Sequence, residues 1–355
     1  HKMECELSKV CSKLLYKTIQ CLAKCGDELY IEASDRLILR AVNSSKSAFV
    51  AFTFQSLFFE RFEVTERIQR CKVLTKPFLS AFKPASTAEQ MVIRIDILPD
   101  PRVILKVTNK QGGVSTCRML YEDADALQAV YSREEWRCCV IARPRLLSEC
   151  LAIFISNIDE ITFQASSAAL RVRSFVDAAK GAKDGQLKNT AKSLQTDISI
   201  DARDFQEYEV TSGDLEITFS LRELRAMLAF CEASSLDVQI RFDGAGKPIL
   251  FSTHTSGPVF FDADFVVATL ADFSEGSQSQ APVSQSQPQR HPPQSVADND
   301  DDQGESQAGP NAAAQPASSQ RRKTKLADSL RGEALAAWRK QEAKEAEAEA
   351  EAEAE

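Results

Sequence analysis

The sequence holds few of the residues that mark catalytic and metal-binding sites. Its 355 residues include only three histidines, His1, His254 and His291, and none of its ten cysteines forms a Cys-x-x-Cys pair. Zinc sites usually need such pairs, or cysteines and histidines close together. A glycine-rich phosphate loop and a nucleophile elbow are also missing. These absences argue against an enzyme, and we expect neither a metal ion nor another cofactor.

Long apolar runs are missing as well. No stretch of about 18 apolar residues occurs, and the first residues lack the basic-then-apolar pattern of a secretory leader. Most cysteines lie in apolar periodic stretches, where a free thiol behaves as a small hydrophobe. We therefore expect a soluble intracellular protein with buried, reduced thiols and no membrane partner.

The composition changes sharply near residue 273. Residues 274–320 are rich in Ser, Gln, Pro and Asp and hold almost no large apolar side chains, so they cannot bury enough area to offset their ordering entropy. An Ala- and Glu-rich end follows a basic patch, which consists of Arg321, Arg322, Lys323 and Lys325. We predict that residues 274–355 form a disordered tail ending in a marginal helix. The basic patch suits nuclear import, although a solvated charge run has the same composition.

The tail also accounts for most of the net charge of −8. Residues 274–355 hold 15 acidic and 9 basic side chains, which leaves 36 acidic and 34 basic ones on residues 1–273. The acidic balance therefore says little about whether the folded part binds nucleic acid. The placement of its basic residues is more informative.

One pattern recurs four times before the tail: a strand, a short amphipathic helix and a meander of strands. The apolar spacing predicts helices over residues 12–25, 76–83, 144–154 and 221–232. An acidic segment with few strand signals separates the second unit from the third. We therefore predict an N-terminal domain over 3–120, a connector over 121–136 and a C-terminal domain over 137–273.

Each predicted helix carries basic residues on its polar side. These are Lys13, Lys17 and Lys24 on the first helix, Lys76 and Lys83 on the second, Arg143 and Arg145 at the third, and Arg222 and Arg225 on the fourth. They could form ordinary solvated surfaces. Their recurrence in a nearly neutral region could instead mark one electropositive surface, which would grip phosphates without reading bases.

Several segments resemble the tail-bearing subunit of the nine-one-one DNA-damage checkpoint clamp, within the family of proliferating cell nuclear antigen. The resemblance covers nearly all of residues 3–273 and rests on Gly26–Phe59, Cys71–Phe82, Leu127–Tyr131, Glu216–Phe251 and Phe265–Asp272. It implies an α+β clamp fold: two similar domains of antiparallel sheet with helices on the inner face, followed by a disordered C-terminal tail. It also implies a ring of three different subunits around double-stranded DNA, placed there by an alternative clamp loader. The nine basic residues above would then face the DNA.

In such a ring, subunits meet where edge strands pair across the boundary. The resemblance places these edges at residues 113–120 in the first domain and 191–200 in the second. The interface residues would be Val114, Thr116, Arg118, Leu120, Leu194, Thr196, Ile198 and Ile200.

The tail holds six Ser-Gln dipeptides, at Ser277, Ser279, Ser284, Ser286, Ser306 and Ser319. Such pairs can arise from composition alone, but their clustering favours phosphorylation by checkpoint kinases. Ser295 precedes an acidic run, a context typical of acidophilic kinases. In the family, a phosphoserine of the tail recruits a BRCT-domain scaffold that activates checkpoint kinase signalling, because phosphate adds charge and acceptors for basic pockets. The expected location is the nucleus.

Two other functional hypotheses remain open. A replicative homotrimeric clamp would share the fold, although the long Ser-Gln tail argues against it. A weak metal-dependent exonuclease could use the carboxylate pairs Glu122 with Asp123 or Asp262 with Asp264. Those carboxylates could equally cap turns and keep the outer surface soluble.

Overall fold

A computed structural model describes residues 3–65, 69–96, 100–127, 129, 136–154, 158–174, 196–211, 213–253 and 261–271. All of them fall within one compact unit. The predicted tail lies outside the described residues, with its Ser-Gln pairs, Ser295 and the basic patch Arg321–Lys325, and so do Leu194 and most of the second half of the connector.

The first half of the chain alternates strands with two helices. Its elements are β1 (Met3–Ser8), α1 (Lys9–Cys25), β2 (Glu28–Ala33), β3 (Arg36–Val42), β4 (Ala48–Gln55), β5 (Arg61–Val64), β6 (Gln69–Leu74), α2 (Thr75–Phe82), β7 (Ala88–Asp96), β8 (Arg102–Asn109) and β9 (Val114–Leu120). A two-residue strand, β10 (Glu122–Asp123), begins the connector and pairs with β6.

The second half repeats this order. Its elements are β11 (Cys138–Ala142), α3 (Pro144–Ala152), β12 (Glu160–Ala165), β13 (Ala169–Ser174), β14 (Asp197–Asp201), β15 (Glu207–Val210), β16 (Leu215–Ser220), α4 (Leu221–Ser234), β17 (Val238–Phe242), β18 (Ile249–Thr253) and β19 (Phe261–Val267). Each element of the first half from β1 to β9 thus has a counterpart in the same sequence position of the second half.

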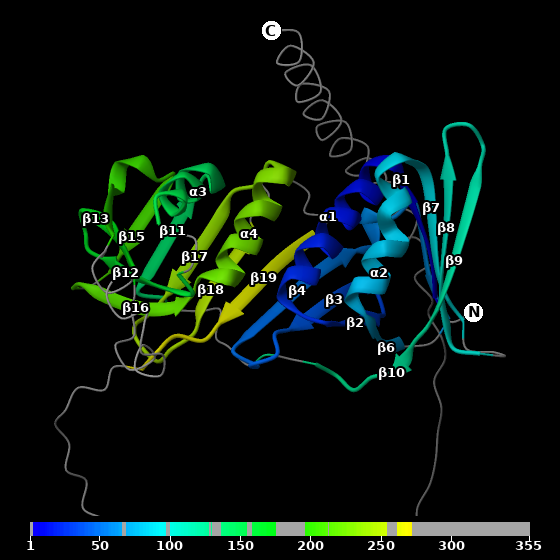
Figure 1. Ribbon diagram of the computed structural model, residues 1–355, viewed down its shortest axis with the longest axis horizontal. Helices are drawn as coiled ribbons and strands as arrows, with labels where there is room; N and C mark the ends of the chain where they lie inside the picture. The colour runs from blue at the N-terminus through cyan, green and yellow to red at the C-terminus, as the bar shows by residue number, and fades with distance from the viewer. Residues whose placement is uncertain are drawn as a thin grey trace, which may run out of the picture. The chain divides into compact units, whose positions relative to one another are not determined.

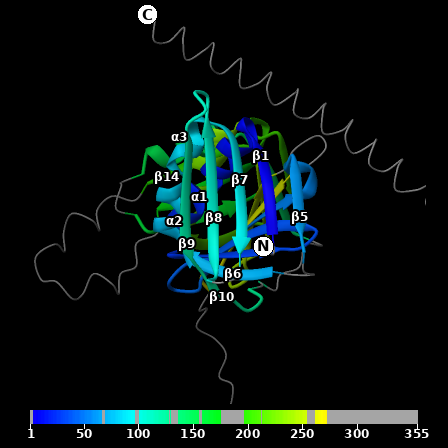
Figure 2. The same ribbon diagram turned by 90° about the vertical axis from the view of Figure 1, so that its right-hand side faces the viewer.

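The strands form three antiparallel sheets. Their orders are β5-β1-β7-β8-β9, β10-β6-β2-β3-β4-β19-β18-β17-β11-β15 and β14-β13-β12-β16. The ten-stranded sheet joins the two halves, because β4 of the first half pairs with β19 of the second from Phe54↔Phe261 to Ala48↔Val267. The helices lie on one side of this sheet (Figures 1 and 2).

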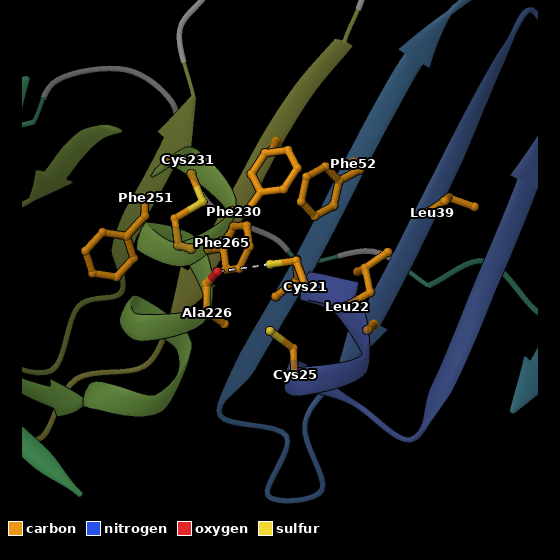
Figure 3. Packing of buried hydrophobic residues seen from close by; sticks show 14 of the residues in the cluster. Cys21, Leu22, Cys25, Leu39, Phe52, Ala226, Phe230, Cys231, Phe251 and Phe265 are labelled. Atoms are coloured by element: carbon orange, nitrogen blue, oxygen red, sulfur yellow. Dashed lines mark hydrogen bonds between the residues drawn. The ribbon is translucent and has the colours of Figure 1, made fainter. Parts of the chain in front are cut away.

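The core follows from strand alternation. In β4, Ala48, Val50, Phe52 and Phe54 are buried, and the residues between them are half-buried, as expected for side chains on opposite faces of a strand. Phe52 packs edge-on against Phe265 of β19 and Phe230 of α4, with ring centroids 5.8 Å and 4.9 Å away (Figure 3). The core is therefore continuous across the junction between the halves. No helix within the described part is long and apolar enough to cross a bilayer.

The sequence predicted all four helices but assigned no residues to strands β1, β5 and β15. Helix α1 begins at Lys9 rather than residue 12, because Ser8 caps it by accepting a hydrogen bond from the Cys11 amide. Helix α2 ends at Phe82, so Lys83 belongs to the following 3₁₀ turn; Pro84 disfavours helical continuation at the residue before it. Helix α3 ends at Ala152, two residues earlier than predicted.

Candidate nucleic-acid interface

The four helices form one layer. Contacts join α2 to α1, α1 to α4 and α4 to α3, so elements distant in the sequence lie side by side (Figure 1). The layer packs against strands through apolar side chains, with α1 on β3 and β4 and α4 on β18 and β19. The polar sides of the helices are therefore free to face away from the sheet.

Basic residues are concentrated in this layer. The four helices hold eight basic side chains and three acidic ones, and one of the acidic ones, Glu223, is buried. Residues 1–273 as a whole are slightly acidic. The helices thus carry an excess of positive charge that the strands and loops do not share.

Seven of the nine predicted DNA-facing residues have exposed side chains. They are Lys24, Lys76, Lys83, Arg143, Arg145, Arg222 and Arg225. Two of them have acidic neighbours: the Lys76 ammonium lies 3.4 Å from Asp27, and the Arg145 guanidinium lies 3.0 Å from Glu149. Exposed pairs of this kind contribute little free energy, so both cations remain able to exchange these carboxylates for phosphates.

Lys13 and Lys17 are half-buried instead. The ammonium of Lys17 donates to the carbonyl oxygen of Ala233 at the end of α4. Arg222, although exposed, donates to the carbonyl oxygen of Lys24 through Nε at 3.0 Å and Nη2 at 2.7 Å. Lys17 and Arg222 are thus bound to the neighbouring helix.

A buried polar contact also joins the two halves. Glu223 is 1% exposed and accepts hydrogen bonds from Asn43 Nδ2 at 3.1 Å and Ser220 Oγ at 2.7 Å. Sequence analysis missed both Asn43 and Glu223. The spacing of Ser220 and Glu223 fits a capping box and could have indicated the local half of this contact.

The strands predicted at the subunit boundaries, β9 and β14, both lie at sheet edges. In β9, four side chains are exposed: Val114, Thr116, Arg118 and Leu120. Val114 is 55% exposed and Leu120 is 67% exposed. In β14, Ile198 is half-buried and Ile200 is buried, and both pack in or against the hydrophobic core of this chain. Arg203 lowers the pKa of Asp201 to about 2, which keeps the carboxylate at the end of β14 ionised.

The carboxylate pairs considered for nuclease chemistry do not form a cluster. Glu122 pairs with Lys72 at 3.2 Å, and Asp123 lies opposite Cys71 in the short β10–β6 ladder. Asp262 and Asp264 occupy alternate positions of β19, and both have further interactions. Among the residues that the structure describes, no three His, Cys, Asp or Glu side chains are placed to hold a metal ion.

Solved structures with a similar fold include proliferating cell nuclear antigens. Proliferating cell nuclear antigen from Thermococcus kodakaraensis aligns with a TM-score of 0.60 and 16% identity, over 75% of this chain and 99% of that one. The PCNA2–PCNA3 complex from Sulfolobus tokodaii aligns with a TM-score of 0.58 and 18% identity, over 76% of this chain and all of the other. The α+β clamp fold predicted from the sequence is confirmed.

Curated relatives are checkpoint and repair proteins. The DNA repair protein rad9 of Schizosaccharomyces octosporus is 26% identical over 68% of this chain and 64% of its own length. The cell cycle checkpoint control protein Rad9 of Drosophila melanogaster is 24% identical over 73% of this chain and 55% of its own length. The matched segments thus span less than two thirds of these relatives. The family model for Rad9 matches residues 15–270, which is most of the described fold, and the chain therefore belongs to the Rad9 family.

Proposed function

We propose that this chain is a subunit of a DNA-damage checkpoint clamp that closes with two other subunits around double-stranded DNA. Its family supports the checkpoint role, and its fold supports the ring. The proposed role is that of a non-enzymatic platform.

The observation that carries the proposal is the repeated strand order. Within the chain, the halves join where β4 pairs with β19. The counterparts of these strands are β14 and β9, and each lies at the edge of its sheet with a described partner strand on one side only. Pairing of β9 with the β14 counterpart of a neighbour would repeat the internal junction at each subunit boundary, and repeated head-to-tail junctions close into a ring when the rotation permits.

DNA would lie against the helix layer. Lysines and arginines from four helices neutralise phosphates and release counterions without reading base edges, so binding would not depend on sequence. The proposed phosphate contacts are all of the seven exposed residues except Arg222, namely Lys24, Lys76, Lys83, Arg143, Arg145 and Arg225, with Lys13 beside them.

The remaining proposed partners are those that the family resemblance implies. We infer that an alternative clamp loader opens the ring in the nucleus and that checkpoint kinases phosphorylate tail serines. A phosphorylated tail would then recruit a BRCT-domain scaffold.

The assembly can be tested by co-purification with two other clamp subunits, using the full chain and a chain without residues 274–355. Both forms should assemble, because the proposed edges lie before the tail. The double variant Val114→Lys/Leu120→Lys should lose at least one partner, since it places two charges on the exposed side of β9. Leu270→Lys is the matched control, because Leu270 is also an exposed leucine, with 44% of its surface exposed, but lies outside β9. Equal recovery of the ring with the β9 variant would contradict the proposed edge.

A homotrimeric ring is the second candidate, and one observation favours it. Strand β9 holds Arg118 and no acidic residue, whereas β14 holds Asp197 and Asp201 and no basic one. Copies of this chain could therefore pair with one another. Light scattering on the isolated full chain distinguishes the two candidates. We expect a monomer; a stable trimer would support the homotrimeric ring and contradict the heterotrimeric one.

A further inference from the structure

Helices α1 and α4 each end with a backbone carbonyl that their own helix does not satisfy. The last four carbonyl groups of an α-helix have no amide partner within it. At the end of α1, the Gly26 amide donates to the Leu22 carbonyl. At the end of α4, the Ser235 amide donates to the Glu232 carbonyl and the Leu236 amide to the Cys231 carbonyl. The carbonyl groups of Lys24 and Ala233 are left for other donors.

Each of these two carbonyl groups receives a cation from the other helix. Arg222, in the first turn of α4, donates two hydrogen bonds to Lys24 O, and Lys17, in the middle of α1, donates one to Ala233 O. Between these two contacts, the Cys21 thiol donates to Ala226 O at 3.3 Å (Figure 3). The order of the contacts shows that the helices run antiparallel, so each positive side chain meets the negative end of the opposing helix dipole.

We propose that Lys17 and Arg222 form an interdomain clasp, a reciprocal pair of helix C-caps that holds the two halves of the chain together. The clasp positions the helix layer and leaves phosphate binding to the other cations. Its existence does not depend on the proposed ring, because every contact lies within one chain.

The outer helices of this chain do not repeat the clasp residues. The counterpart of Arg222 is Lys76, since each is the second residue of its helix and the first residues, Thr75 and Leu221, make equivalent 2.8 Å bonds to the carbonyls of Asp27 and Asp159. Lys76 pairs with the side chain of Asp27 instead of a helix end. Helix α3, the counterpart of α1, holds no basic residue after Arg145. This chain therefore supplies no equivalent of Lys17 or Arg222 from its outer helices α2 and α3.

Three thiols lie under the clasp and can report on it. Cys21 and Cys25 point from α1 toward α4, and Cys231 lies on α4 (Figure 3). All three are buried, at 3%, 2% and 0% exposure. Burial also raises the pKa of Cys21 and Cys231, so both stay neutral and unreactive while the helices remain together.

The test measures N-ethylmaleimide labelling of these thiols in the full chain by peptide mass spectrometry. Arg222→Gln and Lys17→Gln should each label Cys21, Cys25 and Cys231 about tenfold faster or more, because a hydrogen bond to a charged group contributes enough free energy for that factor. Labelling of Cys5, which lies in β1 away from the seam, should not change. Arg222→Lys keeps the charge and should restore much of the protection.

Arg225→Gln is the matched control. Arg225 lies one turn further along α4, is exposed, and has no hydrogen bond or ion pair with another described residue. Slow labelling in Arg225→Gln and fast labelling in Arg222→Gln support the clasp. Equal labelling rates in both variants, or faster labelling of Cys5 together with the seam thiols, would overturn it, because the effect would then be absent or global.

Discussion

Asn43 joins the two halves of the chain through its side chain. Its Oδ1 accepts from the amides of Ser47 and Ala48 at 2.9 Å and 3.0 Å, and its Nδ2 donates to the buried carboxylate of Glu223. The Asn43 side-chain amide thus binds two backbone amides of the β3–β4 turn and one carboxylate oxygen of Glu223 on α4. Such contacts are sensitive, because a buried polar atom that loses its partner keeps its desolvation penalty.

Asn43→Ala should therefore lower the free energy of unfolding by about 2–3 kcal/mol, since it leaves a carboxylate oxygen of Glu223 and two backbone amides without their partner. Urea denaturation of the folded region measures this change. Ser45→Ala, in the same turn, is the control and should change it by less than about 0.5 kcal/mol, because Ser45 is exposed. A similar loss for both variants would mean that the turn, and not the contact with Glu223, is responsible.

Sequence patterns predicted part of the chemistry at this scale. The basic residues and the buried thiols were found from their spacing on helices and in apolar stretches. The partners of Lys17, Arg222 and Asn43 could not be found, because two are backbone carbonyls and the third lies 180 residues away. A pattern of side chains cannot indicate which backbone carbonyl will accept a hydrogen bond, because every residue has one.

Gly26 decides how α1 ends and how closely it approaches β3. A Cβ at this position would lie 2.6 Å from the Val42 carbonyl oxygen, so any larger residue must push backbone apart. The same residue follows the turn whose Lys24 carbonyl receives Arg222. The end of the helix and the start of β2 are thus fixed by the absence of a side chain.

We expect Gly26→Ala to destabilise the fold by about 1–3 kcal/mol, because overpacking against backbone cannot be relieved by a rotamer change. Thermal or urea unfolding can measure it. Gly244→Ala serves as the control, since a Cβ there meets no atom within 4 Å. An unchanged stability for Gly26→Ala would show that α1 and β3 can separate without loss.

Elements were easier to predict than their ends. The helix spacing of apolar residues identified all four helices, since each buries one face. Strand β1 escaped because its alternation, with Met3, Cys5 and Leu7 buried, spans only six residues and includes two glutamates on the other face. Its pairing with both β5 and β7 is a tertiary contact that the local pattern does not contain.

Across the whole molecule, the layer order α2-α1-α4-α3 places cations from both halves on one surface. The repeat was visible in the sequence, but the order was not, because it depends on the pairing of β4 with β19 over more than 200 residues. The proposed DNA contacts follow from this order.

The salt dependence of DNA retention tests the proposed DNA contacts of the helix layer. In the assembled ring, Lys24→Gln with Arg225→Gln should reduce the slope of log K against log salt by up to about 1.8, since each lost phosphate contact removes about 0.9. Lys110→Gln, an exposed lysine between β8 and β9, should leave the slope unchanged. Equal slopes for the double variant and the unaltered ring would remove the helix layer from the DNA interface.

The exposed edge of β9 also has a meaning for a cell that makes this chain. A copy without neighbours displays Val114 and Leu120 beside unsatisfied backbone groups, which is the kind of surface that chaperones and degradation machinery recognise. Under the proposed assembly, we expect surplus copies to be short-lived, so that the abundance of this chain follows the supply of its two companions. Strand pairing would then regulate dosage as well as architecture.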